Sequence, residues 1–176
     1  MIIFISGGVR SGKSSLAERM AMDLFKKLKA KGLYYVATSK RNIDEEMNHR
    51  IKLHQESRTS QWTTIEEPYF IHEKIQLVPN HSVLLVDCLT VWSSNVLFSE
   101  NKSYQIMIER LKKLFDIARL KQLTIIFVSN DLNEEIPILD EGVQSYLYSL
   151  QAVHKYVVSQ SDRAIQVVAG SPINWK

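Results

Sequence analysis

A glycine-rich segment near the N-terminus has the residue types and spacing of a phosphate-binding loop. It reads Gly7-Gly8-Val9-Arg10-Ser11-Gly12-Lys13-Ser14, and it lies between the apolar run at 2–5 and a helical pattern. Glycines let successive backbone N–H groups face one anion, and the following helix adds its positively polarised N-terminus. Lys13 can reach the outer phosphates, and the Ser14 hydroxyl can ligate Mg²⁺. A plain glycine-rich turn is the alternative, but the strand context, the lysine and the serine together favour a nucleoside triphosphate site.

A carboxylate is the expected second anchor for the metal ion. Asp87 ends the apolar run Val83-Leu84-Leu85-Val86, which is typical of a buried parallel strand. A triphosphate site needs a second ligand for its cation, so the sequence predicts Ser14 and Asp87 as the metal-binding pair. The alternative is that Asp87 caps a helix that begins near Thr90.

A second group of candidate residues stands on a charged helical segment, about 44–57. Arg50, His54 and Arg58 are spaced by four residues and would share one helical face. Like charges repel unless an anion lies between them, so a phosphate would stabilise this cluster. A solvated charged face is the alternative. The other histidines (His49, His72, His81 and His154) stand in no comparable pattern, and no Cys/His spacing indicates zinc.

Residues 62–66 could add a further contact to a nucleotide. Trp62, Thr64 and Glu66 alternate, so they would share one face of a short extended segment. The Glu66 carboxylate could accept hydrogen bonds from the N–H edge of guanine, or it could bind a metal.

Composition narrows the class of protein. The chain has 176 residues, 45% hydrophobic and 23% charged, which predicts a single domain over 1–176 with a sizeable core. The net charge of +3 is small and its lysines are helical, so we expect no nucleic-acid partner. The single cysteine, Cys88, cannot form an internal disulfide, which fits a reduced, cytoplasmic environment. No stretch reaches the roughly 18 apolar residues of a membrane span.

The periodicity predicts an α/β fold in which strands alternate with helices. Strands are expected at 2–6, 33–37, 62–66, 83–87, 124–128 and 164–168. Helices are expected at 13–31, 44–57, 69–77, 91–98 and 143–159. A further long helix is expected between 98 and 124, with Met107, Leu111, Leu114 and Ala118 on its buried face. Leu16, Met20, Leu24 and Leu28 form the stripe of the first helix, and 130–142 is loop-like. This order predicts a mostly parallel sheet with helices on both faces, resembling P-loop NTPases. Ligands of such sheets bind beyond the carboxyl ends of the strands, where all these candidates lie.

Taken together, these residues resemble the bifunctional adenosylcobinamide kinase / adenosylcobinamide-phosphate guanylyltransferase family of cobalamin biosynthesis. The resemblance covers most of the chain and is strongest up to about Asn95. It is carried by the glycine-rich loop with its internal arginine, Ala37-Thr38-Ser39, Asp44 with Glu46-Met47, Arg50-Ile51 with His54 and Arg58, Trp62, Thr64, Glu66, Pro68, Asp87-Cys88-Leu89-Thr90 with Trp92 and Asn95, and Val128-Ser129-Asn130.

The resemblance implies a two-step enzyme that uses Mg²⁺ and takes ATP and GTP as substrates. First, a triphosphate gives its γ-phosphoryl group to the aminopropanol hydroxyl of adenosylcobinamide. Then a histidine, at the matched position His54, attacks the α-phosphorus of GTP and passes GMP to the new phosphate. His54 and Lys13 are the expected catalytic residues. The expected nucleotide contacts are residues 7–14, Thr38, Ser39, Lys40, Arg50, Gln55, Glu56, Ser57, Arg58, Glu66 and Asp87. The family is typically homotrimeric.

The C-terminal third departs from the family pattern. Where the family continues E-V-G-x-G-I-V-P, this chain has Asp131-Leu132-Asn133-Glu134-Glu135-Ile136-Pro137, without either glycine. Where the family has G-R-x-N-Q, this chain has Gln151-Ala152-Val153-His154-Lys155. We therefore expect a different path for the 130–142 loop. Two other functions stay open: a kinase of another small alcohol without guanylyl transfer, and a nucleotide-binding protein without catalysis.

Overall fold

The computed structural model describes residues 1–40, 61–132 and 140–176. Its strands are β1 (Ile2–Gly7), β2 (Leu33–Ala37), β3 (Trp62–Glu66), β4 (Val83–Asp87), β5 (Thr124–Asn130), β6 (Arg163–Val168) and β7 (Ser171–Asn174). Its helices are α1 (Lys13–Lys27), α3 (Ile71–Lys74), the 3₁₀ turn η1 (Ile75–Leu77), α4 (Leu89–Ser94), the π-helical turn η2 (Asn95–Ser99), α5 (Tyr104–Leu120) and α6 (Glu141–Gln160).

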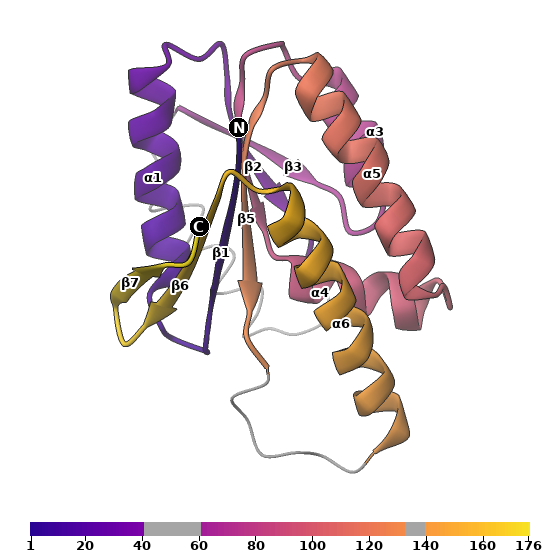
Figure 1. Cartoon of the computed structure of the whole chain (residues 1–176). Helices are drawn as coiled ribbons and strands as arrows, with labels where there is room; N and C mark the ends of the chain where they lie inside the picture. The colour runs from indigo at the N-terminus through magenta and orange to yellow at the C-terminus, as the bar shows by residue number, and fades with distance from the viewer. Residues whose placement is uncertain (41–60, 133–139) are drawn as a thin grey trace.

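The strands form one sheet with the order β3-β2-β4-β5-β1-β6-β7 (Figure 1). Neighbouring strands from β3 to β6 are parallel, and β7 alone runs antiparallel to β6. The predicted mostly parallel α/β sheet is therefore confirmed. The central strands β1, β2, β4 and β5 are almost wholly buried because both faces of the sheet are covered there.

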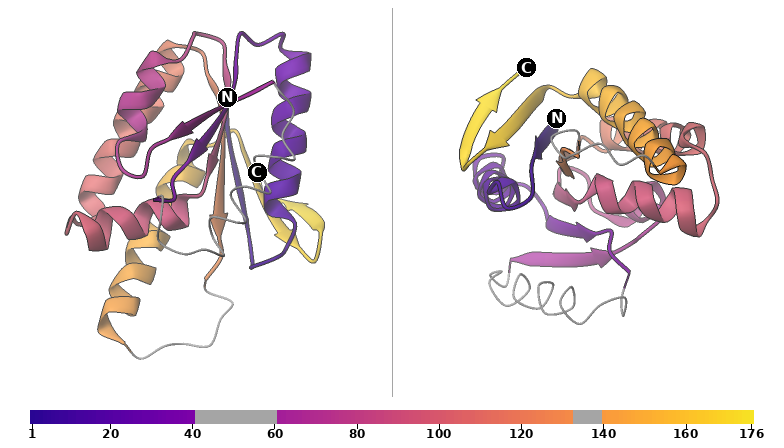
Figure 2. Two further views of the ribbon diagram at one scale, coloured as in Figure 1. Left: turned by 180° about the vertical axis from the view of Figure 1, so that it is seen from behind. Right: turned by 90° about the horizontal axis from the view of Figure 1, so that it is seen from below.

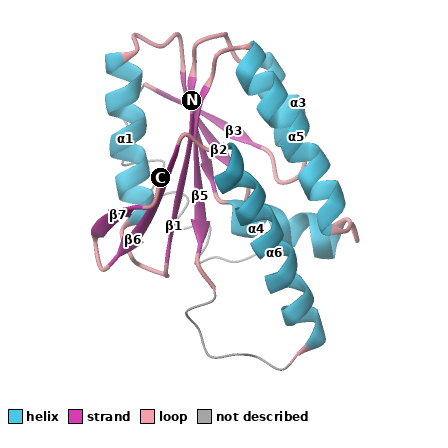
Figure 3. Cartoon of the chain, in the orientation of Figure 1, coloured by secondary structure: helices cyan, strands magenta, loops and turns pink. Residues whose placement is uncertain are grey.

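Helices cover both faces of this sheet. Among the described elements, α1 lies on one face and α3, α4, α5 and α6 lie on the other (Figures 2 and 3). The connection after β1 passes through α1, and the connection after β5 passes through α6 on the opposite face. Connections that diverge in this way from neighbouring parallel strands mark the place where open α/β sheets bind ligands.

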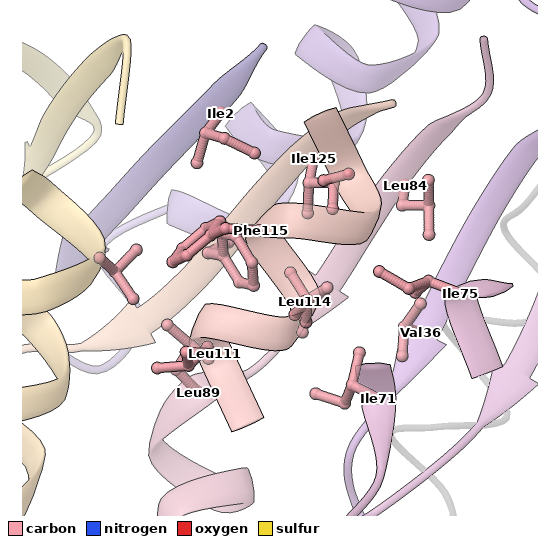
Figure 4. Packing of buried hydrophobic residues seen from close by; sticks show 14 of the residues in the cluster. Ile2, Val36, Ile71, Ile75, Leu84, Leu89, Leu111, Leu114, Phe115 and Ile125 are labelled. Atoms are coloured by element: carbon pink, nitrogen blue, oxygen red, sulfur yellow. The ribbon is translucent and has the colours of Figure 1, made fainter. Parts of the chain in front are cut away.

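The larger part of the core lies beneath α3, α4, α5 and α6 (Figure 4). The predicted buried face of α5 is confirmed, because Met107, Leu111, Leu114 and Ala118 are at most 2% exposed. Phe115 joins them and packs edge-on against Phe127 of β5, with ring centroids 5.8 Å apart. Interdigitated side chains of this kind fix the distance between helix and sheet.

The prediction for α1 was partly wrong. Ala17 and Ala21 are the fully buried apolar residues of this helix, while Leu28 is 50% exposed. Leu16, Met20 and Leu24 pack against the core from partly buried positions. The helix also ends at Lys27, before the predicted end at 31. Small side chains one turn apart let α1 approach the sheet closely, which a stripe of large residues alone does not reveal.

Other element bounds also differ from the sequence prediction. The predicted helix 69–77 is the short α3 followed by η1, the predicted helix 91–98 is α4 followed by η2, and α6 is longer than predicted at both ends. Strand β7 was not predicted, because its four exposed residues include Pro172 and show no apolar alternation. Ala169 and Gly170 both have positive φ and form the tight turn before it. The predicted helix 44–57 and most of the predicted loop 130–142 lie outside the described residues.

Truncating the α5 core should destabilise the protein far more than the same change on the α5 surface. We expect Leu111→Ala to lower the free energy of unfolding by about 2–5 kcal/mol, because it opens a cavity in the packed core. Leu120→Ala is the matched control, because Leu120 lies on the same helix and is 83% exposed. Urea unfolding of both variants measures the difference. Equal effects would contradict the packing of α5 described here.

Candidate active site

The glycine-rich loop joins β1 to α1 at the carboxyl edge of the sheet. Gly7 ends β1, and a Cβ atom at this position would lie 2.5 Å from the Val167 carbonyl oxygen of β6. Only glycine therefore lets β6 approach the loop this closely. Gly12, the N-cap of α1, has φ 91°, and Arg10 has φ 58°, so the loop turns through the left-handed region twice. The Gly170 amide of the β6–β7 turn donates to the Ser11 carbonyl at 3.0 Å and braces the loop.

Lys13 turns back toward the loop from the first turn of α1. Its ammonium donates to the Gly8 carbonyl at 3.0 Å, and the residue is 8% exposed. Burial lowers the pKa of Lys13, while the neighbouring Cys88 and Asp87 side chains oppose this effect. Burial and the Asp87 charge in turn raise the pKa of the Cys88 thiol to about 11, which leaves it neutral near pH 7. The Asp87 carboxylate is therefore the main negative charge facing Lys13.

Asp87 lies at the end of β4, level with Ala37 of β2 and Val128 of β5. The Tyr35 hydroxyl donates to its Oδ2 atom at 2.9 Å and restrains the carboxylate. The N-cap residue of α4 is Cys88, one position after Asp87, and its side chain makes no capping hydrogen bond. The oxygen donors of Asp87 and Ser14 are the kind that Mg²⁺ prefers, and Mg²⁺ takes its remaining ligands from water and phosphate. The described residues contain no group of three or more His, Cys, Asp or Glu side chains that could hold a metal ion alone.

Thr38, at the end of β2, holds the backbone next to Asp87. Its Oγ1 atom donates to the Cys88 carbonyl at 2.9 Å and accepts from the Cys88 amide at 2.8 Å. The Thr38 side chain is fully buried, so it acts on the site through the Cys88 backbone. Ser39 follows in a half-buried position. Lys40 donates to the Ser99 hydroxyl at 2.6 Å, and its ammonium lies 5.2 Å from the centre of the Tyr69 ring.

Three side chains of the 89–95 segment bind backbone at or just beyond the ends of neighbouring strands. The Thr90 hydroxyl accepts from the Asn130 amide of β5 at 2.7 Å. The Trp92 indole donates to the Tyr69 carbonyl at 2.9 Å, and the Asn95 amide donates to the Thr38 carbonyl at 2.8 Å. These contacts explain the spacing of D-C-L-T-x-W-x-x-N physically, since each polar residue supplies a partner to backbone at the carboxyl edge.

Glu66 lies at the same edge of the sheet but on its outermost strand. It is exposed, and β3, which it ends, is separated from β1 by β2, β4 and β5. With about 4.8 Å between neighbouring strands, the Glu66 backbone lies roughly 10 Å from Asp87 and roughly 19 Å from β1. The structure therefore brings together the loop, Lys13 and Asp87, and holds Glu66 apart from them. Arg50, His54, Gln55, Glu56, Ser57 and Arg58 lie outside the described residues.

Sequence reasoning missed the role of His154, which lies on α6. Its Nε2 atom is 2.7 Å from the Ser129 hydroxyl at the end of β5, and its ring centroid is 5.1 Å from that of Phe4. Burial lowers the pKa of His154 to about 4, although the nearby Asp131 carboxylate opposes the shift. The available signal was the position of His154 on the apolar face of α6, beside Val153 and Val157, which are fully buried.

Comparisons with known proteins decide which family has this arrangement. The model of the family "Cobinamide kinase / cobinamide phosphate guanyltransferase" matches residues 3–175. This chain belongs to that family. It is 33% identical to the bifunctional adenosylcobalamin biosynthesis protein CobP of Pseudomonas aeruginosa over 98% of this chain and 95% of that one. It is 37% identical to CobU of Escherichia coli K12, over 56% of this chain and 51% of that one.

A solved structure supports the fold independently. The KaiC-like protein of Pyrococcus horikoshii superposes with a TM-score of 0.55 at 16% identity, covering 94% of this chain and 69% of that one. This likeness confirms the P-loop NTPase-like fold. The family assignment confirms the resemblance read from the sequence, and its match extends through the C-terminal third. Within residues 1–40, 61–132 and 140–176, no helix is both long and apolar enough to cross a membrane.

Replacing Gly7 with alanine should weaken nucleotide binding by about 10-fold or more. The added methyl group would clash with the Val167 carbonyl oxygen, which is backbone and cannot turn aside, so the loop amides would shift. Gly142→Ala is the matched control, because Gly142 lies in the first turn of α6 and, among the described residues, its Cβ would meet a side-chain atom of Asp140 and no backbone. Titration with a fluorescent nucleotide compares the two variants. Unchanged affinity in Gly7→Ala would contradict the close approach of β6 to the loop.

Burial of neutral His154 should make the fold sensitive to acid. Below pH 6.5 the unfolded chain binds a proton at this residue, whereas the folded chain does so only near pH 4. The contribution of His154 to the free energy of unfolding is therefore fully present above pH 6.5 and is lost as the pH drops toward 4. The loss is about 3 kcal/mol, at about 1.4 kcal/mol per pKa unit. Urea unfolding of wild type and His154→Gln between pH 4 and 7 measures this loss. Parallel pH profiles for the two proteins would show that His154 does not cause it.

Proposed function

We propose that this chain phosphorylates adenosylcobinamide with ATP or GTP and then transfers GMP from GTP to adenosylcobinamide phosphate. The proposal rests on two observations together. The phosphate loop is complete, with buried Lys13 and the Asp87 carboxylate beside it, and the family model matches residues 3–175. The relative from Pseudomonas aeruginosa is named as a bifunctional protein of adenosylcobalamin biosynthesis and covers nearly the whole chain.

In the first reaction, the phosphate loop positions the triphosphate. The backbone amides of residues 7–14 and the N-terminus of α1 bind the phosphates, and the Lys13 ammonium exchanges the Gly8 carbonyl for a phosphate oxygen. Ser14 and Asp87 would hold Mg²⁺, which when bound neutralises charge on the phosphate oxygens. The hydroxyl oxygen of the acceptor attacks the γ-phosphorus, and the nucleoside diphosphate leaves.

In the second reaction, we assign His54 as the nucleophile. An imidazole nitrogen bonds to the α-phosphorus of GTP and pyrophosphate leaves; an oxygen of the cobinamide phosphate then displaces the histidine. Arg50 and Arg58 would neutralise the charge that builds up on the α-phosphate. The guanine nucleotide would contact residues 55–58, Glu66 and Asp87. The separation of β3 from β1 supports a guanylyl site toward β3 that differs from the triphosphate site at β1.

The resemblance also leads us to propose a cytoplasmic homotrimer built from one nucleotide-binding domain, 1–176. Its partners would be the nucleotide and the cobinamide substrate. Sedimentation equilibrium with and without GTP would test the oligomeric state, and a monomer under both conditions would count against the trimer.

GTP labelled on the α-phosphate should leave an acid-labile label on the protein after mixing with Mg²⁺ and denaturation. We expect the label to disappear in His54→Ala, because no other group is assigned to form the phosphoramidate bond. His81→Ala is the matched control, because His81 is exposed and far from the carboxyl edge, at the start of β4.

Two outcomes would change the proposed function. Phosphoryl transfer from γ-labelled nucleotide without any label from α-labelled GTP would indicate a kinase alone. Tight binding of Mg²⁺·GTP without turnover in the presence of cobinamide would indicate a binding protein. Lys13→Ala should abolish γ-phosphoryl transfer, which assigns that activity to the phosphate loop.

A further inference from the structure

A chain of hydrogen bonds, buried at its centre, links α6 to the carboxyl edge of the sheet. It begins at the Asn130 amide, which donates to Thr90 Oγ1 at 2.7 Å. Thr90 Oγ1 lies 3.0 Å from Ser129 Oγ, and Ser129 Oγ lies 2.7 Å from His154 Nε2. Ser129 is fully buried and Thr90 is 7% exposed, so water does not compete for these groups.

The Asn130 end of this hydrogen-bonded chain restricts the direction of its protons. The Asn130 N–H can only donate, so Thr90 Oγ1 accepts there and has its own proton to give to Ser129. Ser129 can then donate to His154 Nε2, which requires a neutral imidazole whose proton is on Nδ1. If Nε2 carried the proton, Ser129 would donate to Thr90, and Thr90 would give its own proton to the sulfur of Cys88, which is a weak acceptor. The depressed pKa of His154 agrees with the neutral form.

The chain of hydrogen bonds from His154 ends beside both parts of the phosphate site, the phosphate loop and the strand end that carries Asp87. Asn130 is in register with Gly7, and the Asp131 amide donates to the Gly7 carbonyl at 3.0 Å, so the end of β5 holds the start of the phosphate loop. Thr90 follows Asp87 by three residues and is itself held from α6, because the Tyr146 hydroxyl donates to its carbonyl at 2.8 Å. Thr90 therefore joins the strand end that carries Asp87 to the strand end that supports Gly7.

We propose that His154 is a positioning residue for phosphoryl transfer, acting through Ser129 and Thr90 to hold the Asp87 turn and the phosphate loop in register. As the acceptor at the end of the chain, it favours donation from Thr90 to Ser129 and from Ser129 to His154 Nε2. This inference rests on the proposed function of the site. Reacting groups misplaced by a fraction of an ångström to 1 Å lose rate more than affinity, so the loss should be in kcat.

Three variants test the proposal with γ-labelled ATP and adenosylcobinamide. His154→Phe keeps a ring against Phe4 and removes the acceptor, Ser129→Ala removes the middle of the chain, and His154→Gln keeps an acceptor near the position of Nε2. We expect the first two to lower kcat by about 10-fold with the KM for ATP within about 2-fold of wild type. His154→Gln should restore kcat to within about 3-fold of wild type. The double variant His154→Phe/Ser129→Ala should lose no more than either single variant, because the chain acts as a unit.

A purely structural role would give a different result. Melting temperatures would then fall in His154→Phe and Ser129→Ala while kcat stayed unchanged, and that outcome would overturn the proposal. So would a His154→Gln variant as slow as His154→Phe, because the acceptor would then not matter.

A spectroscopic measurement separates this inference from the proposed function. NMR of the full chain with labelled histidine should show His154 neutral, with its proton on Nδ1, at pH 7, and the Asn130 amide should exchange faster in His154→Phe than in wild type. A proton on Nε2, or unchanged exchange of the Asn130 amide, would overturn the positioning role of His154 whether or not the enzyme transfers phosphoryl groups. Absence of phosphoryl transfer in wild type would overturn the proposed function. The NMR result would then test the hydrogen-bonded chain from Thr90 to His154 by itself.

Discussion

The carboxyl edge of this sheet depends on hydrogen bonds that its own strands cannot supply. Where parallel strands end, backbone carbonyl and amide groups lose their ladder partners and need others if they are buried. Side chains of residues 90–95 bind the ends of β2 and β5 and the segment after β3, and Thr38 binds the backbone of Cys88. This network makes the edge rigid, so that Asp87 and the phosphate loop keep a fixed separation. A preorganised arrangement of charges is what phosphoryl transfer requires of a protein.

The order of the strands spaces the candidate site residues along that edge. The phosphate loop follows β1, Asp87 ends β4, and Glu66 ends the outer strand β3. Lys13 and Asp87 lie close enough for their charges to interact, whereas Glu66 lies two strands beyond Asp87. A two-step enzyme benefits from such spacing, because a triphosphate can be held at one position while the second nucleotide approaches from the other. Under the proposed function, Asp87, which lies between the two positions, would contact both nucleotides.

Helix α6 gives the site its support from the opposite side to α1. It contributes Val153 and Val157 to the core, Tyr146 to the Thr90 carbonyl and His154 to the Ser129 hydroxyl. Burying an imidazole in its neutral form lowers its pKa, and it makes the ring a fixed acceptor instead of a charge. The chain thus uses one histidine for packing and orientation, and another, His54, is assigned to covalent chemistry.

The sequence by itself determined most strands of the sheet, the phosphate loop and the family, because these depend on local patterns. The β1, β2, β3, β4 and β5 runs, the spacing from Gly7 to Ser14 and the position of Asp87 are all set by neighbouring residues. Only the tertiary structure decided that Ala17 and Ala21 face the sheet, that β7 pairs with β6, and that His154 meets Ser129. These contacts join residues far apart in the chain or depend on how closely two elements approach. Hydrophobic periodicity does not specify either quantity, since both follow from packing in three dimensions.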